Sequence, residues 1–76
     1  MPPGPIEAAM QLTINGRPRT FGAPVGTVAD LLRELALEGK RIAVERNGEI
    51  VPRSRYADTS VASGDRLEIV GAVGGG

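Results

Sequence analysis

The stretch MQLTINGRPRTFGAPVGTVADLL, residues 10–32, decides the fold because it places a β-hairpin directly before a helix. Apolar and polar residues alternate over its first six positions, which predicts a half-buried strand with Met10, Leu12 and Ile14 on one face. Asn15-Gly16 follows, and both residue types tolerate positive φ, so the pair predicts a hairpin turn. The fold is therefore expected to begin with two antiparallel strands.

The return strand of this hairpin is RPRTF, residues 17–21, and Phe21 is its expected core anchor. A two-residue turn would place Arg17 opposite Ile14 and Arg19 opposite Leu12, on the core side. Because arginine is rarely buried, we expect a bulge or a longer turn.

A helix is predicted after the breaker GAPVG. Thr27 is its expected N-cap, and Asp30 at the third helical position completes a start that resembles a capping box. One apolar stripe follows at helical spacing, made of Val28, Leu31, Leu32 and Leu35. Asp30, Arg33, Glu34 and Glu38 are expected to face water. Gly39 suits the left-handed residue that ends a helix.

The second half of the chain predicts three more strands. RIAVERNGEIV, residues 41–51, is a hairpin that turns at Asn47-Gly48. Residues 52–65 form a connection that ends in the tight turn Ser63-Gly64-Asp65. RLEIV, residues 66–70, is the last strand, with Leu67 and Ile69 inward. This order favours an α+β fold of the β-grasp type: a mixed sheet of four to five strands with one main helix packed across one face. The first and last strands would be parallel neighbours at the centre of the sheet.

Composition narrows the classes of function. The chain has 76 residues and a formal net charge of zero, which indicates one domain and argues against nucleic acid as the main partner. A solvated surface is the expected role of Arg46, Arg53 and Arg55. With no cysteine and no histidine, disulfides, thiolate or imidazole metal sites, cysteine nucleophiles and histidine bases are excluded. No membrane span or secretion signal is recognisable, so a cytoplasmic location is expected.

The expected organisation has three parts: a disordered extension over residues 1–9, a β-grasp domain over 10–70 and a flexible glycine-rich tail over 71–76. Glycine lacks a β-carbon, so such a tail can pass through a narrow channel. Fully extended, it would reach about 20 Å. The alternative is that the end of the chain merely frays.

The chain resembles the ubiquitin-like sulfur carriers, and among them the thiamine-biosynthesis sulfur carrier family, ThiS. The resemblance is carried by MQLTINGRP, GTVADLL, AVERNGEIVPRSRY, SGDRLEIV and the terminal VGGG. It runs from Met10 to Gly76 and leaves out residues 1–9. The chain departs from the family in having small residues at Gly71 and Ala72, where a bulkier one is common.

The resemblance implies a non-catalytic carrier with no bound cofactor. An E1-like enzyme of the ThiF type, using ATP and Mg²⁺, would adenylate the carboxylate of Gly76. A persulfide route from a cysteine desulfurase would then convert it to a thiocarboxylate, and a thiazole synthase of the ThiG type would take the sulfur. Tail docking would involve Ala72, Val73, Gly74 and Gly75. Val70 and Val44 are the expected partner surface.

Three alternatives remain open at this point. A related carrier could serve molybdopterin synthesis or tRNA thiolation by the same chemistry, although the ending EIVGAVGGG favours ThiS. A ubiquitin-like modifier would be conjugated to lysines through Gly76. A β-grasp interaction module would have an inert tail.

Overall fold

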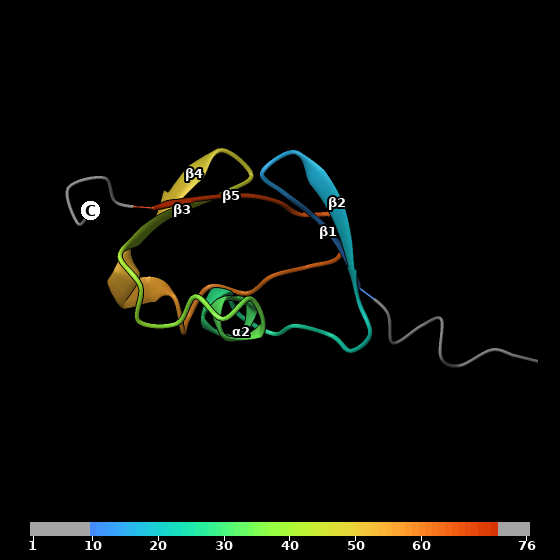
Figure 1. Ribbon diagram of the computed structural model, residues 1–76, viewed down its shortest axis with the longest axis horizontal. Helices are drawn as coiled ribbons and strands as arrows, with labels where there is room; N and C mark the ends of the chain where they lie inside the picture. Colours follow the sequence, from blue (N-terminus) through green and yellow to red (C-terminus); the bar gives the residue numbers. More distant parts are fainter. Residues whose placement is uncertain (1–9, 72–76) are drawn as a thin grey trace, which may run out of the picture.

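The computed structural model describes residues 10–71 and contains one five-stranded sheet, in the order β2-β1-β5-β3-β4. The elements are β1 (Met10–Ile14), β2 (Arg17–Phe21), α2 (Val28–Glu34), β3 (Ile42–Arg46), β4 (Glu49–Val51), the 3₁₀ turn η1 (Arg53–Arg55) and β5 (Arg66–Gly71). Helix α2 lies across one face of the sheet (Figure 1). β1 and β5 pair in parallel, whereas the other strand pairs are antiparallel. The predicted mixed sheet and its parallel centre are confirmed.

The core lies between α2 and the sheet. Its buried members are Leu12, Phe21, Val25, Val28, Leu31, Leu32, Val44, Val51, Val61, Leu67 and Ile69. Phe21 and the helical stripe are core residues as predicted, with Leu35 only partly buried. Val25 and Val61 come from connecting segments, so these loops contribute to the core as the helix and the strands do. Apolar burial of this kind is the main favourable term in folding.

The first hairpin has a two-residue turn, so the expected bulge is wrong. Asn15 and Gly16 take φ of 53° and 82°, and the register pairs Leu12 with Arg19. Because β2 is an edge strand, its arginines reach solvent although they share a face with the core side of β1. The guanidinium carbon of Arg19 lies 5.8 Å from the ring centroid of Phe21, which is within the range of a cation–π contact.

Helix α2 begins at the predicted capping box. The Thr27 hydroxyl accepts from the Asp30 amide at 3.2 Å, and the Asp30 carboxylate accepts from the Thr27 amide at 3.2 Å. The amides of Val28 and Ala29 donate to carbonyls of segment 56–59. The amide groups of the first helical turn, which a helix leaves without internal partners, are therefore satisfied within the protein.

The helix ends earlier than predicted. Leu35 is the C-cap, and Ala36, with φ of 62°, takes the left-handed position that we expected of Gly39. Amide to carbonyl bonds from Leu37 to Leu32 and from Ala36 to Arg33, at 2.7 and 3.1 Å, form a Schellman motif. This early stop turns the partly buried Leu37 back onto the core. Gly39, with φ of 80°, shapes the next turn.

Candidate functional site

The carboxyl end of β5 is the candidate functional site because it leads into the glycine-rich segment. β5 lies between β1 and β3, and its residues alternate between the core and the open face of the sheet. Gly71 pairs with Ile42, so the strand keeps its register one residue beyond the expected end of the domain. The predicted site residues Ala72, Val73, Gly74, Gly75 and Gly76 lie outside the described residues.

Two turn asparagines hold β5 from opposite sides. The Asn15 side chain donates to the Ile69 carbonyl at 3.0 Å and accepts from the Ile69 amide at 2.7 Å. The Asn47 side chain accepts from the Arg66 amide at 2.9 Å. The same residues that allow the hairpin turns therefore also fix the central strand. The sequence gives no local signal of this second role, because Asn15 and Ile69 are 54 positions apart.

The start of β5 is fixed by Asp65, which is buried at 8% exposure. Its carboxylate accepts from the Ala62 amide at 2.8 Å, from the Asn47 side chain at 3.1 Å and from Arg46 Nε at 2.9 Å. Burial raises the pKa of Asp65, but the hydrogen bonds from Ala62, Asn47 and Arg46 and the positive charge of Arg46 outweigh it, so the pKa is lowered. Asp65 is thus more than a turn residue: it joins the β3–β4 turn to the start of β5.

The open face of the sheet carries the exposed apolar residues near the candidate site. Val70 is 57% exposed, in keeping with the expected partner surface, and its docking role stays a prediction. Val44 is 1% exposed and packs in the core, so its assignment to a partner surface is wrong. Side chains alternate along β3, and Val44 shares the inward face with Ile42. Ile50, at 74% exposure, was missed. The Asn47-Gly48 turn pairs Val44 with Val51, so Ile50 must face outward.

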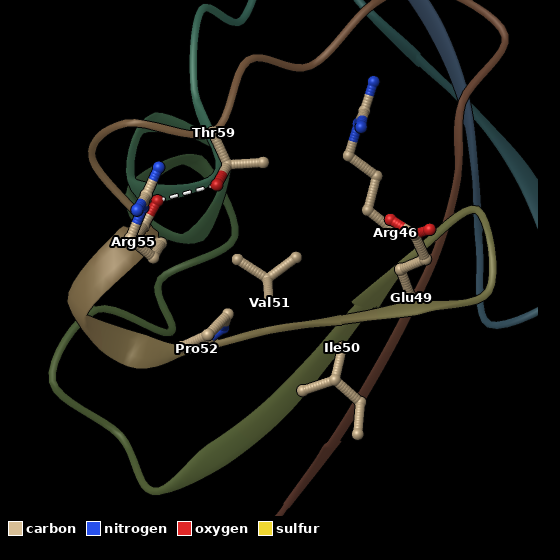
Figure 2. A pocket seen from close by; sticks show the side chains of 7 residues that line it. All are labelled: Arg46, Glu49, Ile50, Val51, Pro52, Arg55 and Thr59. Atoms are coloured by element: carbon tan, nitrogen blue, oxygen red, sulfur yellow. Dashed lines mark hydrogen bonds between the residues drawn. The ribbon is translucent and has the colours of Figure 1, made fainter.

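The arginine-rich region contains no free cluster of three arginines. Figure 2 shows Arg46 and Arg55 among the residues that line a pocket, together with Ile50, Val51 and Thr59. Arg46 is ion-paired with Asp65, and Arg53 lies outside this pocket. The expected solvated position is confirmed for Arg53 and Arg55, which are exposed, but it is wrong for Arg46, which is partly buried and ion-paired with Asp65.

Within residues 10–71, no group of three or more carboxylate, cysteine or histidine side chains could hold a metal ion. No helix among these residues is long and apolar enough to cross a membrane.

A mixed sheet crossed by one helix, with the last strand at its centre and leading to the C-terminal glycines, defines the ubiquitin-like β-grasp class. The chain belongs to the ThiS family, whose family model matches residues 12–76.

Two relatives and one solved structure illustrate this membership. The sulfur carrier protein ThiS of Bacillus subtilis is 42% identical over 65 residues, which cover 86% of this chain and 98% of that protein. The structure of the thiamine biosynthesis protein ThiS from Geobacter metallireducens matches with a TM-score of 0.76 and 39% identity, covering 88% of this chain and all of that one. A thiazole synthase of Paramagnetospirillum magneticum is 54% identical over 67 residues. That match covers 88% of this chain, which spans only 20% of the thiazole synthase.

Proposed function

We propose that this protein is a sulfur carrier of thiamine biosynthesis, and that the carboxylate of Gly76 is the group that carries the sulfur. The observation that carries the proposal is the family match, which runs through the glycines to residue 76. The likeness to the Bacillus carrier over nearly its whole length supports it. The family match favours thiamine biosynthesis over molybdopterin synthesis, tRNA thiolation and protein modification.

The chemistry requires little of the carrier itself. A carboxylate is a poor electrophile, so the Gly76 carboxylate would first attack the α-phosphorus of ATP and release pyrophosphate. The resulting acyl adenylate has a good leaving group, and a persulfide sulfur would displace AMP at the carbonyl. A thiol would then cleave the acyl disulfide and leave the thiocarboxylate. The carrier has no cysteine or histidine, so the catalytic groups would belong to its partners, and the carrier itself would be non-catalytic.

Three partners are part of this proposal. A ThiF-type adenylating enzyme would use ATP and Mg²⁺, and a cysteine desulfurase route would supply the persulfide. A ThiG-type thiazole synthase would accept the sulfur. The region similar to this chain within a thiazole synthase supports the last of these, because two functions joined in one protein often act together. We place all of these steps in the cytoplasm.

Intact mass spectrometry tests the proposal. The protein is incubated with the adenylating enzyme, ATP, Mg²⁺ and a sulfur donor, and we expect a gain of about 16 Da as sulfur replaces oxygen. Deletion of Gly76 is expected to abolish the gain and leave the thermal unfolding transition unchanged. Isopeptide adducts on other proteins would support a modifier instead. A wild-type mass that never changes would support an inert interaction module.

A further inference from the structure

We propose that Lys40 is an acylation site: its side-chain amine captures the activated carboxylate of Gly76 in the same chain and closes an isopeptide bond. The inference rests on the proposed function, which supplies the activated carboxylate. It adds a second fate for that group, because the amine of Lys40 competes with the persulfide sulfur. The product is a ring of residues 40–76 that has no free terminal carboxylate and carries no sulfur.

The chain offers few groups that can attack an acyl adenylate. Lys40 is the single lysine in the sequence, and the other basic side chains are arginines. An arginine guanidinium keeps its proton in proteins and therefore does not attack a carbonyl group. With no cysteine in the chain, the strong nucleophiles are the amine of Lys40 and the α-amine of Met1. Because β1 and β5 are parallel, Met10 lies at the opposite end of the sheet from Gly71, so Lys40 is the nearer candidate.

The register of the sheet places Lys40 beside the start of the tail. Ile42, the first residue of β3, pairs with Gly71, the last residue of β5 (Figure 1). Paired Cα atoms on antiparallel strands lie about 5 Å apart, and two residues span at most about 7 Å. The Cα atoms of Lys40 and Gly71 are therefore within about 12 Å. A flexible chain of five residues has an r.m.s. length of roughly 12 Å, so residues 72–76 are long enough to bring Gly76 to Lys40.

The backbone of Lys40 is held by hydrogen bonds, whereas its side chain is free. The Lys40 amide donates to the Leu37 carbonyl at 3.1 Å, and the Lys40 carbonyl accepts from Arg53 Nη2 at 3.4 Å. Lys40 is exposed, and neither of the ion pairs within residues 10–71 includes it. A flexible four-carbon stem on a fixed backbone lets the amine meet a group that arrives from the tail.

The charge around Lys40 suits the activated tail. Arg41 is its neighbour in the sequence, and Arg53 contacts its carbonyl. Glu38 is the acidic residue that lines the same shallow hollow as Lys40 and Arg53, so positive charge is in excess there. The phosphate of an acyl adenylate is negatively charged and is attracted to this excess.

The capture step needs no oxidant and no reductant. The neutral amine of Lys40 attacks the carbonyl carbon of Gly76, so that a C–N bond forms and the C–O bond to AMP breaks. AMP leaves with the electron pair of that bond, and the nitrogen loses a proton to solvent. The ring is about 18 Da lighter than the free carrier, whereas the thiocarboxylate is about 16 Da heavier. One mass spectrum therefore separates the two fates.

A chemically activated, full-length carrier tests the proposal without any enzyme. The chain is prepared as a C-terminal thioester at Gly76 by cleavage of an intein fusion, and its products are followed by intact mass spectrometry and peptide mapping. We expect the wild type to form the ring through Lys40 at a rate that does not change on tenfold dilution. Lys40→Arg should yield only the hydrolysed acid. Both chains should melt at the same temperature, because Lys40 is exposed.

The matched control moves the lysine away from the tail. Arg19 pairs with Leu12, and the next residue, Thr13, pairs with Arg66. Arg19 therefore lies level with the start of β5, about 20 Å along the sheet from the level of Gly71 at about 3.3 Å per residue. Effective concentration falls when a linker can scarcely span two sites. We expect the thioester of Lys40→Arg/Arg19→Lys to cyclise at least about tenfold more slowly than the wild type.

The outcomes separate this inference from the proposed function. Ring closure in Lys40→Arg, a bond to the α-amine, chains joined into dimers, or a wild-type thioester that only hydrolyses would overturn the capture at Lys40. With the adenylating enzyme and a sulfur donor, Lys40→Arg should still gain about 16 Da. A sulfur gain without ring closure of the thioester would uphold the carrier and reject the capture. Ring closure through Lys40 without any sulfur gain would support the capture site and reject the carrier chemistry.

Discussion

At the scale of single residues, Ala36 is the position with the clearest unfavourable backbone. Its φ of 62° is left-handed, which costs an L-residue roughly 1–2 kcal/mol. Glycine avoids this cost, but it gives the unfolded chain more conformational freedom, which lowers the free energy of unfolding by about 0.4–1 kcal/mol. We therefore expect Ala36→Gly to raise the free energy of unfolding by about 0.5–1 kcal/mol in urea denaturation. The matched control is Ala57→Gly at an exposed position without positive φ, which should not stabilise. A destabilised Ala36→Gly would contradict the Schellman ending.

Asp65 gives the protein a stability that depends on pH. Its folded pKa is lowered by its hydrogen bonds and by Arg46, despite the opposing effect of burial. A group with a lowered folded pKa stabilises above its unfolded value, about 3.9 for aspartate, and that contribution is lost as the pH falls through the folded value. We expect Asp65→Asn to cost about 1–3 kcal/mol at pH 7, because an amide leaves at least one donor without an acceptor.

Melting curves from pH 7 to acid check this expectation. The difference in melting temperature between wild type and Asp65→Asn should be largest at neutral pH and shrink below about pH 4. The exposed Asp58 is the control site, and Asp58→Asn should leave the melting temperature near that of the wild type. A gap between wild type and Asp65→Asn that widens in acid would show that the sign assigned to this pKa is wrong.

At the scale of elements, the hold on β5 depends on the turns of two hairpins. Replacing Asn15 by glycine keeps the positive φ of the turn but removes both side-chain hydrogen bonds to Ile69. We expect Asn15→Gly to destabilise by about 1–3 kcal/mol and to speed hydrogen exchange at the Ile69 amide. Asn47→Gly is the reciprocal control and should expose the Arg66 amide instead. Equal acceleration at both amides in both variants would mean that β5 opens as a unit and that the two contacts are not local.

The elements were predictable where their signals are local. Each asparagine–glycine pair predicted the turn of its hairpin, and Thr27 with Asp30 predicted the start of the helix. The end of the helix was not predictable from the sequence, because alanine is a good helix former by propensity. The left-handed conformation of Ala36 depends instead on the packing of Leu37 against the core.

Of the two residues expected on the partner surface, Val44 is buried and Val70 is exposed. The error at Val44 also comes from a contact between residues that are distant in the sequence. Alternation along β3 places Val44 on the same face as Arg46, and an inward arginine obscures which face is buried. Arg46 is accommodated there by Asp65, 19 positions later, and no local pattern reveals that pairing. Val70 is exposed, as a partner surface requires, because the inward Leu67 and Ile69 of β5 leave it on the opposite face.

At the scale of the whole molecule, the fold and the proposed chemistry use different parts of the chain. The core cluster of the described residues runs from Leu12 to Ile69, and the sulfur would be carried at Gly76. The first and last strands pair at the centre of the sheet, so closing the sheet also brings the chain to the point where the glycines begin. A partner could thus recognise the folded domain and act on Gly76, five positions beyond the last residue of β5.

This separation predicts the behaviour of truncated chains. A chain that stops after Gly71 retains every described core residue and the whole of β5, so we expect a cooperative melting transition within a few degrees of the wild type. A chain that stops after Asp65 loses Leu67 and Ile69 together with the central strand, and we expect no cooperative transition, as followed by circular dichroism. Neither chain should gain sulfur in the mass assay, because both lack Gly76. Loss of folding in the first chain would show that residues 72–76 belong to the scaffold, and the division between fold and chemistry would then fail.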